Sequence, residues 1–227
     1  DRGKWYGNHY NNEPNNDAEA MFPMARFSEF SNRVANNEYN PTGYWPKKLV
    51  NLNTRWRDAN ELTYLSYPYP DMRFADLLLL AAETINESTP GDDNVAVNPE
   101  VYSYVDMVRE RAGLEGIVET YQKYAIADKK NKPMTKGGMR EIIRRERKVE
   151  LSLEGQDYWD QKRWKTAHIE LNRNIQGWNV TAEDPSPSAY YVPTTIYTKR
   201  FTLRDYFAPI PESDLINNPQ LVQNPGW

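Results

Sequence analysis

Two carboxylates four residues apart, Glu146 and Glu150, are the first candidates for chemistry in this sequence. The surrounding apolar residues have helical spacing, and residues four apart lie on one face of a helix. Two close carboxylates can hold different pKa values and act as the acid and base of a glycoside hydrolase. The same glutamates could instead form ion pairs with Arg144, Arg147 or Arg163 that tie two helices together. We favour the ion pairs, because neighbouring guanidinium groups keep both carboxylates ionised.

A second candidate group combines aromatic rings and side-chain amides near the start of the chain. Trp5, Tyr6, Asn8 and His9 follow one another closely, and Trp56 lies between two arginines as a weaker candidate. Aromatic faces can stack on the apolar side of a pyranose ring, while amides bind its hydroxyl groups. The pattern therefore predicts a carbohydrate-binding loop. A mobile segment at one end of the chain is the alternative that stays open.

The composition excludes several classes of function. The 227 residues carry a formal charge of −4, a mean hydropathy of −0.88 and 13% aromatic residues. Because the charge is nearly balanced, the sequence offers no excess of basic residues for binding nucleic acid. The aromatic content is unusual for a disordered chain. Because there is no cysteine and there are only two histidines, we expect no thiol nucleophile, no metal site and no cofactor.

Helical patterns begin near residue 71, after a long irregular segment. The apolar residues of 72–87 occupy nearly the whole helix circumference, which predicts a helix buried between others. Asn98 and Pro99 form a helix start, with a capping residue and a proline at the first position. Together, 71–113 reads as a helical hairpin of about the size of a tetratricopeptide (TPR) unit.

The stretch 139–164 is the most informative part of the helical region. Gly155 divides it into two helices, since a glycine after the last turn commonly ends a helix. Glu146 falls on the apolar stripe of the first helix, where a carboxylate is costly unless it is paired. The remaining residues of this stripe are Met139, Ile142, Ile143, Val149 and Leu153.

Four separated segments resemble the SusD/RagB family of nutrient-binding outer-membrane lipoproteins. They are PDMRFADLLLLAAETINE at 70–87, YSYVDMVRERAGL at 102–114, REIIRRERKVELSLEGQDYWDQKRW at 140–164 and FAPIPESDLINNPQLVQNPGW at 207–227. Each occurs in the family's order and at spacing like that of the family. The resemblance covers residues 67–227, with 43–48 as an outlying match. Gln156 departs from it, since the family commonly has a basic residue or histidine there.

The resemblance implies a mostly α, SusD-like fold with TPR-type helical hairpins, long irregular loops and little β structure. It implies a loop-rich segment at 1–70, which could form part of a ligand-binding face. A helical domain with an extended C-terminal strap would then span 71–227. Family members are about twice as long, so we expect this chain to correspond to a C-terminal half. The lipid anchor would lie outside it.

The resemblance further implies a non-catalytic role at the outer membrane, on the cell surface. Such a receptor would bind oligo- or polysaccharides for nutrient uptake and pass them to a TonB-dependent transporter of the SusC type. The matched segments would be structural, since the ligand sites of the family lie in variable loops. Peptide capture by the same scaffold is the first alternative, and glycoside hydrolysis by Glu146 and Glu150 is the second.

Overall fold

The computed structural model divides the chain into two compact units. The helical unit comprises Pro70–Arg163, and the ribbon unit comprises Asp1–Tyr69 with Trp164–Trp227. The single domain over 71–227 that the resemblance implies stays a prediction, and 164–227 belongs here to the ribbon unit. No helix among the described residues is long and apolar enough to cross a membrane. The described residues are 40–44, 46, 48–49, 55–56, 62–63, 66, 68–184 and 186–227, with only the backbone of 55–56 and 62–63.

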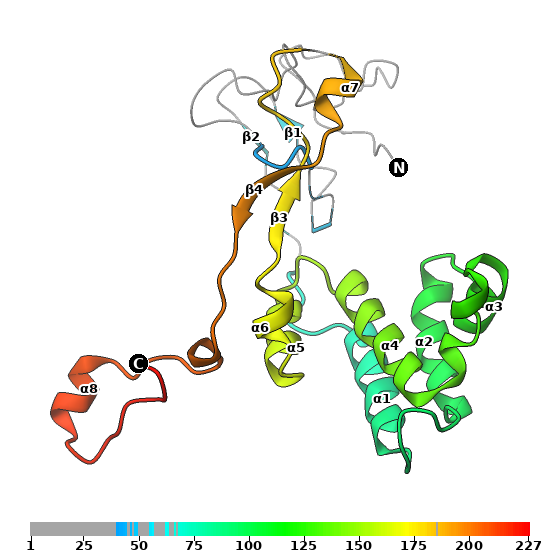
Figure 1. Ribbon diagram of the computed structural model, residues 1–227, viewed down its shortest axis with the longest axis horizontal. Helices are drawn as coiled ribbons and strands as arrows, with labels where there is room; N and C mark the ends of the chain where they lie inside the picture. The colour runs from blue at the N-terminus through cyan, green and yellow to red at the C-terminus, as the bar shows by residue number, and fades with distance from the viewer. Residues whose placement is uncertain are drawn as a thin grey trace. The chain divides into compact units, whose positions relative to one another are not determined.

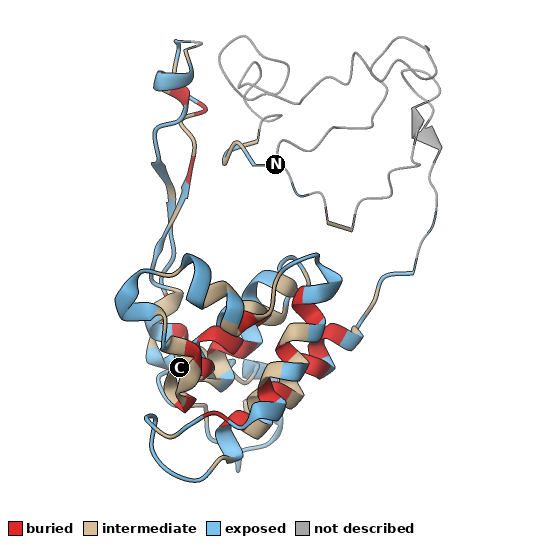
Figure 2. Ribbon diagram, turned by 90° about the vertical axis from the view of Figure 1, so that its right-hand side faces the viewer, coloured by how far each residue is buried: buried red, intermediate tan, exposed pale blue. Residues whose placement is uncertain are grey.

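The helical unit is built on three longer helices that pack along one another (Figure 1). Buried aliphatic side chains from α1, α2 and α4 form one core, and Leu79, Val105 and Ile143 are fully buried within it. Figure 2 shows the buried residues gathered on these helices. The helices are α1 (Phe74–Ser88), α2 (Pro99–Arg111), α3 (Ile117–Tyr124), α4 (Lys136–Glu150) and α5 (Gln156–Arg163), with short 3-10 turns η2 (Ala127–Lys129) and η3 (Lys132–Met134).

The predicted helical hairpin is present as α1 and α2. Asn98 caps α2, because its side-chain oxygen accepts a hydrogen bond from the backbone N–H of Glu100 at 3.0 Å. Pro99 occupies the first helical position, where its missing N–H costs no helical hydrogen bond. Gly155 has a φ of +79° between α4 and α5, so the expected break between these helices is confirmed.

Two packing expectations were wrong. The helix α1 is not buried on all sides, since Phe74 is 67% exposed and Leu77 is 49% exposed. On α4, the outer part of the predicted stripe faces solvent, with Val149 65% exposed, and Leu153 beyond the helix is 60% exposed. Arg147 is buried instead. The apolar periodicity did not predict that Arg147 is buried. A guanidinium group lies in a core only when residues of other helices form hydrogen bonds or ion pairs with it.

In its described residues, the ribbon unit consists of short elements joined by irregular chain. The strands pair as two antiparallel ribbons, β1 (Arg55–Trp56) with β2 (Leu62–Thr63) and β3 (Asn174–Gly177) with β4 (Thr194–Thr198). Between β3 and β4, the chain forms a loop that carries α7 at one end of the ribbon (Figure 1). The remaining elements are α6 (Ala167–Glu170), α7 (Pro187–Tyr190), η4 (Leu203–Tyr206) and α8 (Glu212–Asn217).

The last residues of the chain close back on η4. The indole N–H of Trp227 donates to the carbonyl oxygens of Arg204 and Phe207, and the Arg204 guanidinium lies 4.3 Å from the centre of the indole ring. At the start of η4, the backbone N–H and hydroxyl of Thr202 both donate to Asp205. These hydrogen bonds hold the pKa of Asp205 below its ordinary value.

Candidate functional site

An aromatic cluster forms in the ribbon unit where residues 40–44 meet the chain that leaves β3. The Trp178 ring is central: it lies 5.7 Å from the Tyr44 ring and 5.2 Å from the Tyr191 ring, measured between centroids. Tyr190 packs edge-on against Tyr191 at 5.0 Å. Rings at such separations attract one another beyond the effect of burying their area. We call Tyr44, Trp178, Tyr190 and Tyr191 the aromatic cluster.

A tight turn positions Tyr44 in this cluster. The side-chain oxygen of Asn40 accepts hydrogen bonds from the backbone N–H groups of Thr42 and Gly43, at 2.9 and 3.0 Å. This is a turn in which an asparagine side chain replaces a backbone acceptor. The backbone N–H of Trp178 then donates to the Thr42 carbonyl at 3.0 Å. The turn is thereby attached directly to the residue at the centre of the cluster.

Two glycines allow this close approach. Gly43 has a φ of +71°, and a Cβ atom there would overlap the Tyr190 hydroxyl and lie 3.1 Å from Trp178 Cδ1. At Gly177, a Cβ atom would lie 2.6 Å from the Thr42 carbonyl oxygen. Both positions therefore require the absence of a side chain, and Gly43 also requires left-handed backbone.

The other side of the cluster comes from the chain between the two strands. Ser186 caps α7 by accepting from the backbone N–H of Ala189 at 3.3 Å. The backbone N–H of Asn179 donates to the Tyr190 carbonyl at 3.0 Å. Val180 and Tyr190 are buried, with Trp178 packed against them. This small apolar core fixes the position of Tyr191, the next residue in the chain.

The rings of the aromatic cluster differ in exposure, which distinguishes a ring that supports the cluster from the rings that a ligand can contact. Tyr190 is only 6% exposed, whereas Tyr44 is 56% and Tyr191 is 46% exposed. The interplanar angle is 34° between Tyr44 and Trp178 and 86° between Trp178 and Tyr191, so the two exposed rings are differently inclined to Trp178. An exposed tyrosine offers an apolar ring and a hydroxyl group, which suits a ligand with both apolar and polar faces.

The site residues predicted from the sequence lie almost entirely outside the described residues. Trp5, Tyr6, Asn8 and His9 belong to the part of the chain that the structure does not describe. Trp56 is placed through its backbone in β1, with no description of its side chain. Their role in ligand binding therefore stays a prediction.

Glu146 and Glu150 are engaged in ion pairs. Glu146 accepts from Arg109 of α2 at 2.7 Å, and Glu150 accepts from Arg73 and Arg111, both at 2.8 Å. The ion-pair interpretation is thus confirmed for both carboxylates. The expected partners were wrong, because these cations come from α2 and the residue before α1. Hydrogen bonds to the Glu154 and Glu150 carboxylates in turn raise the pKa of Arg73 above its ordinary value.

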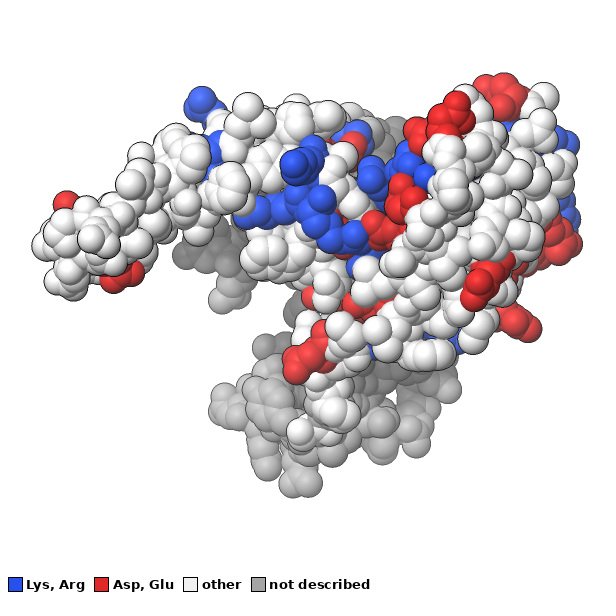
Figure 3. Space-filling view, turned by 90° about the horizontal axis from the view of Figure 1, so that it is seen from below, with Lys and Arg blue, Asp and Glu red and all other residues white. Residues whose placement is uncertain are grey.

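A buried charge network lies at the centre of the helical unit. Arg147 is 2% exposed, and its guanidinium contacts Asp76 of α1 and Asp160 of α5, each at 2.8 Å. Arg163 extends the network by binding Asp160 and Glu83. On the surface, Figure 3 shows acidic and basic side chains interspersed on this unit. These guanidinium and carboxylate groups hold helices together, so this arrangement supports structure and offers no reactive pair.

The family comparison decides where the chain belongs. The model of the SusD family matches residues 4–227. This chain is a member of the SusD family. The match includes the residues of the buried charge network.

Relatives of known sequence and structure agree with this membership. SusD-like protein P2 of Formosa agariphila is 29% identical over 208 residues, which are 91% of this chain and 34% of that protein. The solved structure of BT4246 is 26% identical with a TM-score of 0.71, and the match covers 90% of this chain and 32% of BT4246. A SusD-like carbohydrate-binding protein from Bacteroides fragilis (BF0978) is 26% identical with a TM-score of 0.54, over 80% and 33% of the two chains.

These comparisons confirm the mostly α, SusD-like fold that the sequence predicts. They also show that this SusD chain spans about a third of the length of the relatives it matches.

The aromatic cluster was not predicted as a site. No binding role was expected from the sequence for residues 43–51 or 178–193. A local signal was present, since Trp178 and the Tyr190-Tyr191 pair interrupt a polar stretch. The signal that was missing is the pairing with Tyr44, which lies far away in the sequence and meets Trp178 only in the folded chain.

Proposed function

We propose that this SusD chain is a non-catalytic glycan-binding protein of the cell surface and that the aromatic cluster contacts the glycan. The observation that carries the proposal is the pair of exposed rings, Tyr44 and Tyr191, supported by Trp178. Family membership supports it, as does a related structure from Bacteroides fragilis that is described as a carbohydrate-binding protein. The Glu146 and Glu150 ion pairs give no support to hydrolysis.

The finer parts of the proposal follow from the family. The glycan would be delivered to a SusC-type, TonB-dependent transporter at the outer membrane, with the protein held there as a lipoprotein. Residues 1–70 would add ligand contacts through Trp5, Tyr6, Asn8, His9 and Trp56, and 71–227 would supply the scaffold and strap. Stacking on single rings is weak, so a polysaccharide would be held by several contacts at once.

The first experiment is affinity electrophoresis of this chain against a panel of soluble polysaccharides. We expect retardation by at least one of them, and about a tenfold loss of affinity for each exposed ring removed in Tyr44→Ala and Tyr191→Ala. The matched control is Tyr124→Ala, which removes a tyrosine that is 66% exposed in the helical unit.

The results separate several explanations. Equal retardation of the Tyr44→Ala/Tyr191→Ala double variant and the control would reject the aromatic cluster as the site. A loss in Trp5→Ala/Tyr6→Ala alone would move the site to the opening segment. If no glycan retards the chain and unmodified peptides bind to it, the peptide-capturing alternative is favoured and the proposal is overturned.

A further inference from the structure

The β3–β4 ribbon has one face made entirely of exposed neutral polar side chains. The cross-strand pairs are Asn174 with Thr198 and Gln176 with Thr195. Side chains two apart on a strand share a face, so these four lie on one side of the ribbon. All four are exposed. We call Asn174, Gln176, Thr195 and Thr198 the polar face.

A β-bulge produces this uniform face. The register passes from Ile175 with Tyr197 to Gln176 with Thr195, so Ile196 has no cross-strand partner. A regular register would place Ile196 opposite Gln176 and on the same face. With the bulge, Thr195 takes that position opposite Gln176. Ile196 lies on the other face, in the space that a side chain at residue 177 would need. Bulges commonly re-aim side chains in this way.

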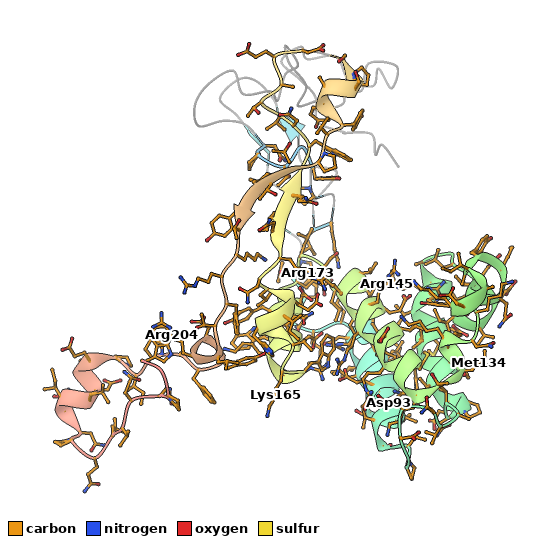
Figure 4. All side chains as sticks on the ribbon, viewed as in Figure 1. Asp93, Met134, Arg145, Lys165, Arg173 and Arg204 are labelled. Atoms are coloured by element: carbon orange, nitrogen blue, oxygen red, sulfur yellow. The ribbon has the colours of Figure 1, made fainter. Side chains whose placement is uncertain are left out.

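The hydrogen-bonding groups of the polar face are not used within the described part of the protein. None of the four side chains has a hydrogen bond to another described residue. Charged residues of the ribbon lie instead beyond its open end, with Arg173 before β3 (Figure 4) and Lys199 and Arg200 after β4. The face therefore offers amide and hydroxyl groups to a ligand and no net charge.

The polar face leads toward the aromatic cluster. Trp178 directly follows β3, and from Asn174 to Trp178 a strand rises by about 13 Å at ~3.3 Å per residue. That distance is longer than a single sugar ring. A ligand stacked on the cluster could therefore extend along the ribbon, with its further hydroxyl groups beside Gln176 and Thr195.

We propose that the polar face is a second part of the glycan site, which binds the hydroxyl groups of a neutral oligosaccharide longer than two residues. The inference rests on the proposed function, since the aromatic cluster holds the first sugar ring. Gln176 and Thr195 are the central contacts, and Asn174 and Thr198 are the distal ones. The amide and hydroxyl groups match sugar hydroxyls as donors and acceptors, and an acidic glycan gains no ion pair from them.

The test compares short and long oligosaccharides by isothermal titration calorimetry. The probes are the disaccharide and hexasaccharide of the cello, laminari and malto series, with hexagalacturonate as the acidic comparison. We expect at least one hexasaccharide to bind about tenfold more tightly than its disaccharide. The Gln176→Ala/Thr195→Ala double variant removes most of that difference, since two hydrogen bonds are lost, and leaves disaccharide affinity unchanged.

Thr194→Ala is the matched control, because Thr194 is the neighbouring exposed threonine on the opposite face. Equal losses of hexasaccharide affinity in Thr194→Ala and Thr195→Ala would overturn the inference. Tighter binding of hexagalacturonate than of every neutral hexasaccharide would also overturn it, as would binding of none of the neutral probes. An extended peptide that binds wild type and the double variant equally, with no sugar bound, would indicate strand addition at a ribbon edge instead.

Failure of this inference is distinguishable from failure of the proposed function. A length effect that survives Gln176→Ala/Thr195→Ala, while Tyr44→Ala/Tyr191→Ala abolishes binding, rejects only the polar face. Unchanged binding in the tyrosine double variant rejects the aromatic cluster and with it the basis of this inference.

Discussion

The buried charge network of the helical unit and the polar face of the ribbon unit use their polar side chains in opposite ways. In the helical unit, Arg147 lies between Asp76 and Asp160, and Arg109 binds Glu146. In the ribbon unit, Gln176 and Thr195 are exposed and have no hydrogen bond to another described side chain. Groups that satisfy one another stabilise a scaffold, whereas groups left exposed remain available for a ligand.

The buried charge network and the exposed loops are under different physical constraints. A buried ion pair requires both partners, since an unpaired charge inside a protein is costly. Arg147 and Asp160 both lie in the segment 140–164, one of the four that resemble the family. Loops such as 40–44 meet no such requirement, and they are where the exposed ring of Tyr44 lies.

The strongest test of the comparison removes the central cation of the helical unit. Arg147→Met leaves Asp76 and Asp160 buried without their shared partner, and we expect the free energy of unfolding to fall by about 3–5 kcal/mol. Urea unfolding followed by circular dichroism measures this change. Arg145→Met is the control, since Arg145 is exposed on the same helix (Figure 4). Equal midpoints for the two variants would show that the buried network does not stabilise the unit.

A second test contrasts a buried and an exposed ion pair on α4. Glu146→Gln weakens the contact with Arg109, whose side chain is 8% exposed, and should lower the free energy of unfolding by about 1–3 kcal/mol. Glu141→Gln affects a carboxylate that is 69% exposed and pairs with Lys132, so we expect a change below about 1 kcal/mol.

The same proteins test the hydrolase alternative. We expect no release of reducing ends from any polysaccharide by the wild-type chain. Turnover in wild type that disappears in Glu146→Gln, with unfolding unchanged, would contradict the structural assignment of this carboxylate.

The smallest effect concerns the close packing of the ribbon unit. Gly43→Ala and Gly155→Ala both place a side chain at positive φ, +71° and +79°, which costs about 1–2 kcal/mol in each case. Only at Gly43 does the new Cβ atom meet neighbours, namely Tyr190 and Trp178. We expect Gly43→Ala to reduce the near-ultraviolet circular dichroism of the coupled rings and to weaken glycan retardation. Unchanged spectra and retardation would mean that the turn does not position Tyr44.

Much of the helical unit followed from local sequence signals. Asn98 and Pro99 marked the start of α2, and Gly155 marked the break between α4 and α5. Capping and helix termination depend on residues within one or two turns, so the sequence carries them directly. The exposure of Phe74 was not predictable in this way, because an apolar helix face shows only that it can be buried and not that a neighbour covers it.

The sequence by itself therefore determined the helical hairpin, the start of α2, the break between α4 and α5, and the family. Only the tertiary structure decided that Glu146 binds Arg109, that Tyr44 packs on Trp178, and that the bulge at Ile196 brings Thr195 beside Gln176. Each of these is a contact between separate segments. Such contacts leave no periodic trace in either segment, because they depend on how the chain folds back and on which side of a strand each residue lies.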